Sequence, residues 1–122
     1  MGGERSVAFS MPGGEAGKSN GSRPIDLAHL SRQTMGDRTL EQEVLALFLQ
    51  QAAGVSRKIA AASVHDRLLM VHGLKGSARG VGAFAIAECA TAIERDPHDA
   101  AIWKRLAALV QSASDFVAAI GR

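Results

Sequence analysis

The sequence predicts an all-α protein, an antiparallel up-down four-helix bundle preceded by a short N-terminal cap helix. Apolar residues make up 47% of the chain and aromatic residues only 4%, so that Ala and Leu supply most of the apolar surface. This composition is typical of closely packed helices. Apolar residues also recur at spacings of three and four along several segments joined by short connections, and no segment shows the alternation of a half-buried strand.

The chain divides into a tail and one small domain. Residues 1–24 are rich in Gly and Ser and have no sustained apolar period, so we expect a flexible tail that buries too little surface to offset the entropy of ordering. Residues 25–122 are long enough for one small core. They are therefore expected to form the bundle.

The cap helix is predicted at the stretch "PIDLAHL". Asp26 is a preferred helix-capping residue, while Ile25 and Leu30 occupy the two positions of a hydrophobic staple. Gly36 is expected to end this helix.

A long second helix is predicted to begin at a capping-box pattern formed by Thr39 and Gln42. One mostly apolar face follows at helical spacing. Its positions are Leu40, Val44, Leu47, Phe48, Gln51, Val55, Ile59 and Ala62.

Two further helices are predicted on either side of a glycine-rich turn. Ser63 with Asp66 offers a cap for the third helix, which Gly80 and Gly82 are expected to terminate. The fourth helix runs over residues 83–95. The residues predicted to face inward are Val71, Leu74, Ala78 and Val81 in the third helix, and Ile86, Cys89, Ala90 and Ile93 in the fourth.

The last helix is predicted to start with Asp96 as its cap and Pro97 as its first residue. It is expected to stop near Gly121. Its apolar stripe consists of Ile102, Leu106, Leu109, Ala113, Phe116 or Val117, and Ile120.

Charge and cysteine content exclude several classes of function. Fourteen basic and twelve acidic residues are interspersed along the chain and give a net charge of +2, so no nucleic-acid partner is expected. The single cysteine, Cys89, excludes a disulfide framework and a multi-cysteine zinc site and fits a reducing compartment. There is no membrane-length apolar run and no secretory signal pattern. We therefore expect a cytoplasmic protein without a membrane partner.

The stretch "VHGLKGSARGVGA", residues 71–83, places a histidine among basic and glycine residues. With His72 at 0° on a helical wheel, Lys75 lies at about 300°, Gly76 at about 40° and Arg79 at about 340°, whereas the core positions lie between about 180° and 260°. His72 is thus expected to point away from the core. Lys75 would supply positive charge to an anion, and Gly76 would leave room for a partner. This arrangement suits phosphoryl transfer with imidazole as the nucleophile.

The same stretch resembles the signature of histidine-containing phosphotransfer (HPt) domains. That signature is H-x-L-K-G-S, followed by an apolar residue and a glycine nine and ten positions after the histidine. The similarity continues through "FAIAECATAIE", which ends on Glu94, and covers roughly residues 25–120. The matching residues of the signature are His72, Leu74, Lys75, Gly76, Ser77, Val81 and Gly82.

The resemblance implies a monomeric carrier in bacterial multistep phosphorelays. His72 would take a phosphoryl group from an aspartate in the receiver domain of a hybrid histidine kinase and pass it to the receiver domain of a response regulator. Glu94 would accept a hydrogen bond from the other ring nitrogen. Mg²⁺ in such relays belongs to the receiver, so no cofactor is expected for this chain.

The chain lacks ATP-binding motifs and the H-E-x-x-x-P pattern of kinase dimerisation helices, so it is expected to be a histidine phosphotransferase intermediate and not an ATP-dependent kinase. The alternative is a helical adaptor that binds receiver domains or other signalling proteins without being phosphorylated. A metal site of His65 and His72 is excluded because seven residues of helix span about 10.5 Å.

Three neighbours of the histidine are candidates for partner binding. Leu68 and Leu69 precede His72 by one turn and lie off the centre of the core stripe. They form either packing at the edge of the bundle or part of an apolar docking patch. Arg79 belongs either to a solvated basic face or to the same docking surface.

Overall fold

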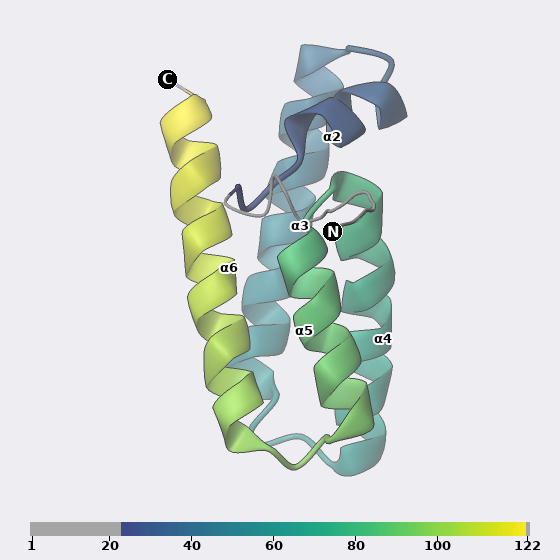
Figure 1. Ribbon diagram of the computed structural model, residues 1–122, viewed down its shortest axis with the longest axis vertical. Helices are drawn as coiled ribbons and strands as arrows, with labels where there is room; N and C mark the ends of the chain where they lie inside the picture. Colours follow the sequence, from purple (N-terminus) through teal and green to yellow (C-terminus); the bar gives the residue numbers. More distant parts are fainter. Residues whose placement is uncertain (1–22, 122) are drawn as a thin grey trace, which may run out of the picture.

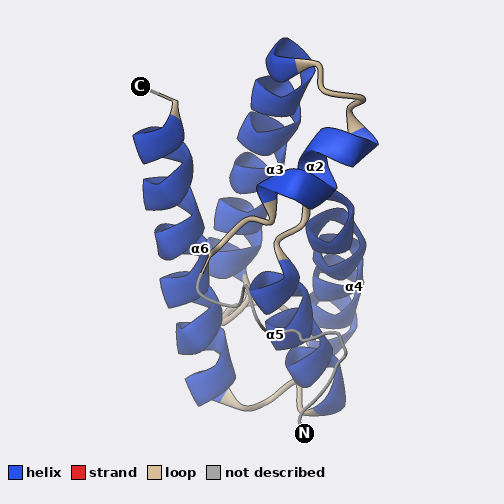
Figure 2. Cartoon of the chain, turned by 45° about the horizontal axis from the view of Figure 1, so that its top comes forward, coloured by secondary structure: helices blue, strands red, loops and turns tan. Residues whose placement is uncertain are grey.

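The computed structural model describes residues 23–121, and all regular structure in that range is helical (Figures 1 and 2). The all-α prediction is therefore confirmed. Apart from its last two residues, the predicted tail lies outside the described residues.

Four long helices lie side by side along the long axis of the molecule, and a short helix lies across the end at which the first long helix begins (Figure 1). α3 packs against α4 and α6, and α5 packs against the same two helices, while α2 contacts α3 and α4. α4 is therefore held between α3 and α5. The helices are α2 (Leu27–Gln33), α3 (Arg38–Lys58), α4 (Val64–Val81), α5 (Phe84–Arg95) and α6 (Ala100–Ile120).

The core is mostly aliphatic, with Phe48 as its one buried aromatic residue among residues 23–121, and receives side chains from all five helices. Each fully buried Leu or Ile contributes about 1.5–3 kcal/mol relative to an exposed position. Ile25 and Leu30, the two positions of the predicted staple, are both buried in the core, and their mutual contact stays a prediction. The largest fully buried side chains are Ile25, Leu30, Ile59, Val71, Leu74, Ile86, Cys89, Ile93 and Leu106.

Two predicted helix caps are confirmed. Asp26 accepts a hydrogen bond from the backbone N–H of His29 at the start of α2, and Ser63 accepts one from Asp66 at the start of α4. α2 ends at Gln33 with Thr34 as its C-cap, so the helix stops three residues before Gly36, the residue predicted to end it. Gly36 follows in the left-handed conformation, with a φ of +78°.

The predicted start of α3 at Thr39 is wrong. Asp37 is the cap, and its carboxylate accepts a hydrogen bond of 3.0 Å from the backbone N–H of Leu40. Aspartate caps at least as well as threonine, and capping two residues earlier lets Arg38 and Thr39 join the first turn. α3 also ends at Lys58, with Ile59 as its C-cap, so Ala62 belongs to the connection.

The predicted start of α6 at Asp96 and Pro97 is also wrong. The backbone N–H of Asp96 donates to Ala92 and so closes α5, and the chain needs three more residues to turn before α6 begins. Asp99 is the cap of α6, accepting a hydrogen bond from the backbone N–H of Ala101.

All residues predicted to face inward in α4 and α5 are buried, and Arg67 and Ala87 are buried in addition. The buried stripes of α3 and α6 differ in part from the prediction. α3 has two overlapping apolar stripes. The predicted stripe includes the polar residue Gln51, whereas the stripe that faces the core contains only apolar residues. Leu40 and Leu47 therefore remain exposed. In α6, Val110 is buried and Ile120, near the end of the helix, is exposed. The buried stripe of α3, continued by its C-cap, consists of Leu45, Phe48, Ala52, Val55 and Ile59.

The turn between α4 and α5 depends on Gly82. This residue has a φ of +86°, and its carbonyl accepts a hydrogen bond of 2.9 Å from the backbone N–H of Asp26. A Cβ atom at this position would lie 2.8 Å from the Asp26 carbonyl oxygen. Gly82 therefore ends α4 as predicted, whereas Gly80 lies inside α4, and its predicted role as a terminator is wrong.

Arg67 ties together two connections at the opposite end of α4. Its side chain is buried, with donor–acceptor distances of 2.9 Å to the carbonyl oxygens of Ile59, Ala62 and Pro97. Its guanidinium carbon also lies 4.3 Å from the centre of the Trp103 ring. The Arg67 side chain thus joins the α3–α4 and α5–α6 connections and fixes the start of α4.

Candidate functional site

His72 lies in the middle of α4 and points into solvent, with 74% of its side chain exposed. Its neighbour Val71 and the following Leu74 are fully buried on the opposite side of the helix. The prediction that His72 faces away from the core is therefore confirmed. The rigid core beneath α4 fixes the backbone from which the imidazole projects.

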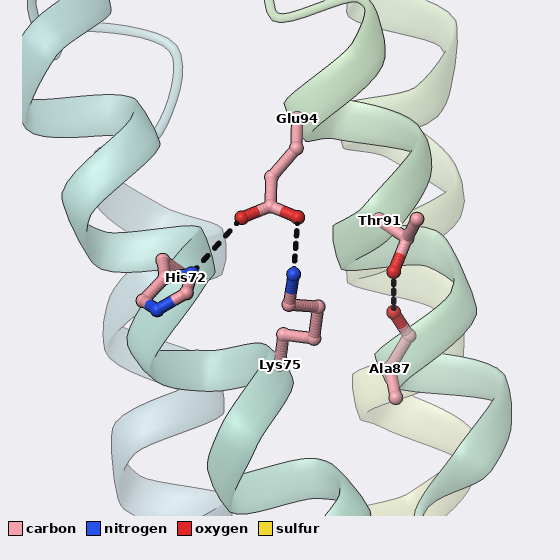
Figure 3. A network of polar contacts seen from close by, with 5 residues as sticks. All are labelled: His72, Lys75, Ala87, Thr91 and Glu94. Carbon is pink, nitrogen blue, oxygen red and sulfur yellow. Dashed lines mark hydrogen bonds and ion pairs between the residues drawn. The ribbon is translucent and has the colours of Figure 1, made fainter.

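Glu94 on α5 joins His72 and Lys75, which both come from α4 (Figure 3). One carboxylate oxygen, Oε2, lies 3.2 Å from Nδ1 of His72. The other, Oε1, accepts a hydrogen bond of 2.6 Å from Nζ of Lys75. Lys75 and Glu94 are only 19% and 25% exposed, so this ion pair lies at the base of an exposed histidine. We call these three residues the histidine centre.

The hydrogen bond from Lys75 is the main cause that lowers the pKa of Glu94 below its ordinary value. Burial raises this pKa and the contact with His72 lowers it further, with a net downward shift. Glu94 is therefore ionised at neutral pH, and an ionised carboxylate only accepts hydrogen bonds.

The ionised carboxylate determines which ring nitrogen of His72 is free. Nδ1 must carry the proton in its contact with Glu94, because the carboxylate has none to donate. In a neutral imidazole the other nitrogen then carries the lone pair. The lone pair of a neutral His72 ring is therefore on Nε2, and 74% of this side chain is exposed to solvent.

The structure brings the predicted site residues His72, Lys75 and Glu94 together. Nζ of Lys75 is bound to Glu94, and its contact with phosphoryl oxygens stays a prediction. The sequence reasoning missed this ion pair, because its members are nineteen positions apart on two helices. No local spacing rule could have found it.

Gly76 is not required by the fold. A Cβ atom there would meet nothing within 4 Å, and the same holds for Gly80. At Gly73 it would come no closer than 3.8 Å, to the side-chain amide of Gln51. An interior helical glycine costs about 0.5–1 kcal/mol relative to alanine. Nothing in the described part of the chain offsets that cost at Gly76, and its role in giving a partner access stays a prediction.

The three candidate partner-binding residues all lie on α4 with His72. Leu68 is half-buried, Leu69 is 61% exposed and Arg79 is exposed. Their role in docking stays a prediction.

Residues 23–121 offer neither a metal site nor a reactive thiol. No three His, Cys, Asp or Glu side chains gather closely enough there to hold a metal ion. Burial raises the pKa of the Cys89 thiol, which therefore stays protonated. The same stretch of chain contains no helix with both the length and the apolar character needed to cross a bilayer.

No protein-family model, no curated protein and no solved structure matches this chain, so the geometry of the histidine centre and the sequence signature around it carry the functional argument.

Proposed function

We propose that this chain is a histidine phosphotransfer protein that relays a phosphoryl group between receiver-domain aspartates through His72. The observation that supports this proposal best is the exposed imidazole whose Nδ1 faces an ionised Glu94 and whose Nε2 points away from that carboxylate (Figure 3). The H-x-L-K-G-S pattern from His72 to Ser77 is the supporting feature of the sequence.

In the first step, the lone pair of His72 Nε2 attacks the phosphorus of an aspartyl phosphate held by the donor receiver domain. A P–N bond forms and the P–O bond to the aspartate breaks, so its electron pair returns to the aspartate carboxylate. The ring becomes cationic while the proton stays on Nδ1. Glu94 at 3.2 Å stabilises that charge.

In the second step, the same bonds form and break in the opposite sense. An aspartate of the acceptor receiver attacks the phosphorus, the P–N bond breaks, and the electron pair returns to Nε2. Lys75 adds positive charge close to the phosphoryl oxygens, and the bare backbone at Gly76 lets the partner approach. Mg²⁺ is supplied by the receiver, and the phosphoryl group comes from a partner and not from ATP.

The proposal also covers the topology of the helices, the oligomeric state and the location in the cell. We assign the four long helices to an antiparallel up-down bundle with α2 as its cap helix. The short connections and the packing of α3 and α5 against both α4 and α6 support this assignment. A monomeric protein in the cytoplasm would meet receiver domains there.

The experiment that tests this proposal is phosphotransfer from receiver domains of the same organism that carry ³²P-labelled aspartyl phosphate. We expect label on this chain that is stable in base and lost in acid, as a phosphohistidine requires. His72→Gln should abolish labelling, and His65→Gln, on the same helix, should leave it unchanged.

Failure to label the chain from any of these receivers would contradict the proposal, as would equal labelling of His72→Gln. Tight binding of a receiver without any label would instead identify the chain as a helical adaptor.

A further inference from the structure

A second surface feature of α4 lies apart from the histidine centre, at the end of the molecule where α3 ends and α4 begins (bottom of Figure 1). It is a wide, solvent-open hollow of about 730 Å³. We call it the α3–α4 hollow. Its walls include Arg57, Lys58, Ala61, Asp66, Leu69 and Met70.

The apolar part of the hollow is left uncovered by the fold. Leu69 lines it with 61% of its surface exposed, and Met70 beside it is half-buried against the core. Alanines of the α3–α4 connection complete the apolar lining. Such a concave apolar surface is suited to the burial of one large apolar side chain from outside.

The rim of the hollow is cationic. Arg57 and Lys58 form the last turn of α3, and among residues 23–121 neither lies within ion-pair distance of a carboxylate. Asp66 is the only acidic residue in the lining, so the hollow carries a net positive charge. Cations at the end of α3 also interact favourably with its helix dipole, but that interaction does not account for the uncovered apolar floor beside them.

One wall residue of the hollow, Leu69, lies near the histidine centre on α4. Leu69 precedes His72 by three residues on α4, a rise of about 4.5 Å along the helix axis. Protein interfaces extend well beyond this distance from one contact atom, so we expect a domain that brings an aspartyl phosphate to Nε2 of His72 to contact Leu69 as well.

We propose that the α3–α4 hollow is the specificity-determining contact for the receiver partner. It takes a segment of that partner in which a large apolar side chain stands next to a carboxylate. The apolar side chain fills the hollow over Leu69, and the carboxylate pairs with Arg57 and Lys58. This inference rests on the proposed function, since it assigns a recognition surface to the same transfer reaction.

The test compares two double charge reversals. One replaces Arg57 and Lys58 by Glu. The matched control replaces Lys104 and Arg105 by Glu; these are also adjacent and exposed, but they lie on α6, which packs against α3 and α5. Each double variant changes the net charge by the same amount. The probe is any receiver domain of the same organism that labels the wild-type chain or binds it.

We expect the Arg57/Lys58 variant to weaken receiver binding and lower kcat/KM for transfer by about tenfold at low salt, with most of the change in KM. The Lys104/Arg105 variant should stay within about twofold of the wild type. Labelling of His72 by phosphoramidate, a small donor that needs no docking, should be unchanged in both variants. A milder double variant, Arg57→Gln with Lys58→Gln, should also weaken receiver binding with unchanged helicity. The single variant Leu69→Ala should have the same effect.

Equal losses in the two charge-reversal variants would overturn the proposal, because they would show a general effect of net charge. Unchanged receiver binding in the Arg57/Lys58 variant would overturn it as well. Failure of the proposed function is distinguishable from both outcomes. It appears as absent labelling of the wild-type chain or as labelling that survives His72→Gln, whereas receiver binding to the hollow is measured in the His72→Gln variant too.

Discussion

Arg67 and His72, two polar residues of α4, differ in the partners of their hydrogen bonds. Arg67 is 5% exposed, and backbone carbonyls of Ile59, Ala62 and Pro97 occupy its donors. His72 is 74% exposed and has one partner, Glu94, for one of its two ring nitrogens. Arg67 is thus satisfied by the fold itself, whereas His72 leaves one nitrogen for a group from outside. The difference separates a residue that holds the bundle together from one that the bundle presents.

The glycines of α4 and its C-cap show the same contrast. Gly82 has a left-handed φ and no room for a side chain, so the fold requires it. Gly76 has ordinary helical geometry and open space around it. Nothing in the described chain requires glycine at position 76, and its proposed role in giving a partner access to His72 stays a prediction.

The largest expected effect on stability is at Arg67. Replacing Arg67 by Met leaves buried carbonyls without a donor, and we expect the free energy of unfolding to fall by about 3 kcal/mol. Urea unfolding followed by circular dichroism measures this, with Arg95→Met, at an exposed position, as the control. Phosphotransfer per folded molecule should be preserved. If Arg67→Met kept the wild-type free energy of unfolding but lost phosphotransfer, Arg67 would act in the reaction and not in stability. That result would contradict the contrast between Arg67 and His72.

The two glycines should respond in opposite directions. Gly82→Ala forces a Cβ against Asp26 at an unfavourable φ and should destabilise the protein by about 2 kcal/mol. Gly76→Ala should stabilise it by about 0.5–1 kcal/mol. It should nevertheless slow transfer from a receiver, because the added methyl group occupies the partner's approach. The same unfolding and labelling assays measure both variants. Faster or unchanged transfer in Gly76→Ala would remove its proposed role.

Lys75 should affect chemistry more than stability. Lys75→Ala removes a partly exposed ion pair with Glu94, so we expect a loss of only about 0.5 kcal/mol. Transfer should slow by about tenfold, because positive charge near the phosphoryl group and the anchor of Glu94 are both lost. Lys104→Ala on α6 is the control in rapid-quench labelling. A large fall in thermal stability would mean that Lys75 is structural.

The smallest expected effect is a pH dependence due to Glu94. The pKa of this carboxyl is lowered in the folded protein from an ordinary value of 4.5. The folded state therefore gains stability from the ionised form above that value and loses it as the pH falls through the folded pKa. The difference in unfolding free energy between wild type and Glu94→Gln should shrink on acidification from about pH 6 to about pH 3. A constant difference in urea titrations across this range would contradict the assigned charge.

The sequence predicted the elements and the exposed histidine well because both depend on local periodicity. The caps at Asp26 and Ser63, the buried stripe of α4 and the direction of His72 follow from spacing alone. The starts of α3 and α6 were wrong because each segment offers two competing caps within three residues, and the geometry of the preceding turn decides between them. A local pattern does not contain that geometry.

The rest of the site depends on contacts between helices. The Lys75–Glu94 ion pair and the α3–α4 hollow each join segments whose relative position only the packed bundle sets. The buried contacts of Arg67 also join distant segments, but the sequence does contain a signal for them. On the helical wheel it lies at about 220°, in the middle of the apolar stripe. A charged residue in that direction is a signal that a buried network will satisfy it.

The central claim is that the histidine centre presents Nε2 of His72 as the atom that carries the phosphoryl group. Nuclear magnetic resonance of the ¹⁵N-labelled imidazole after transfer from a receiver identifies the phosphorylated nitrogen directly. We predict a phosphoryl group on Nε2 of His72 and a protonated Nδ1 hydrogen-bonded to Glu94. A phosphoryl group on Nδ1, on another histidine, or on no histidine after exposure to all the receivers would contradict the account.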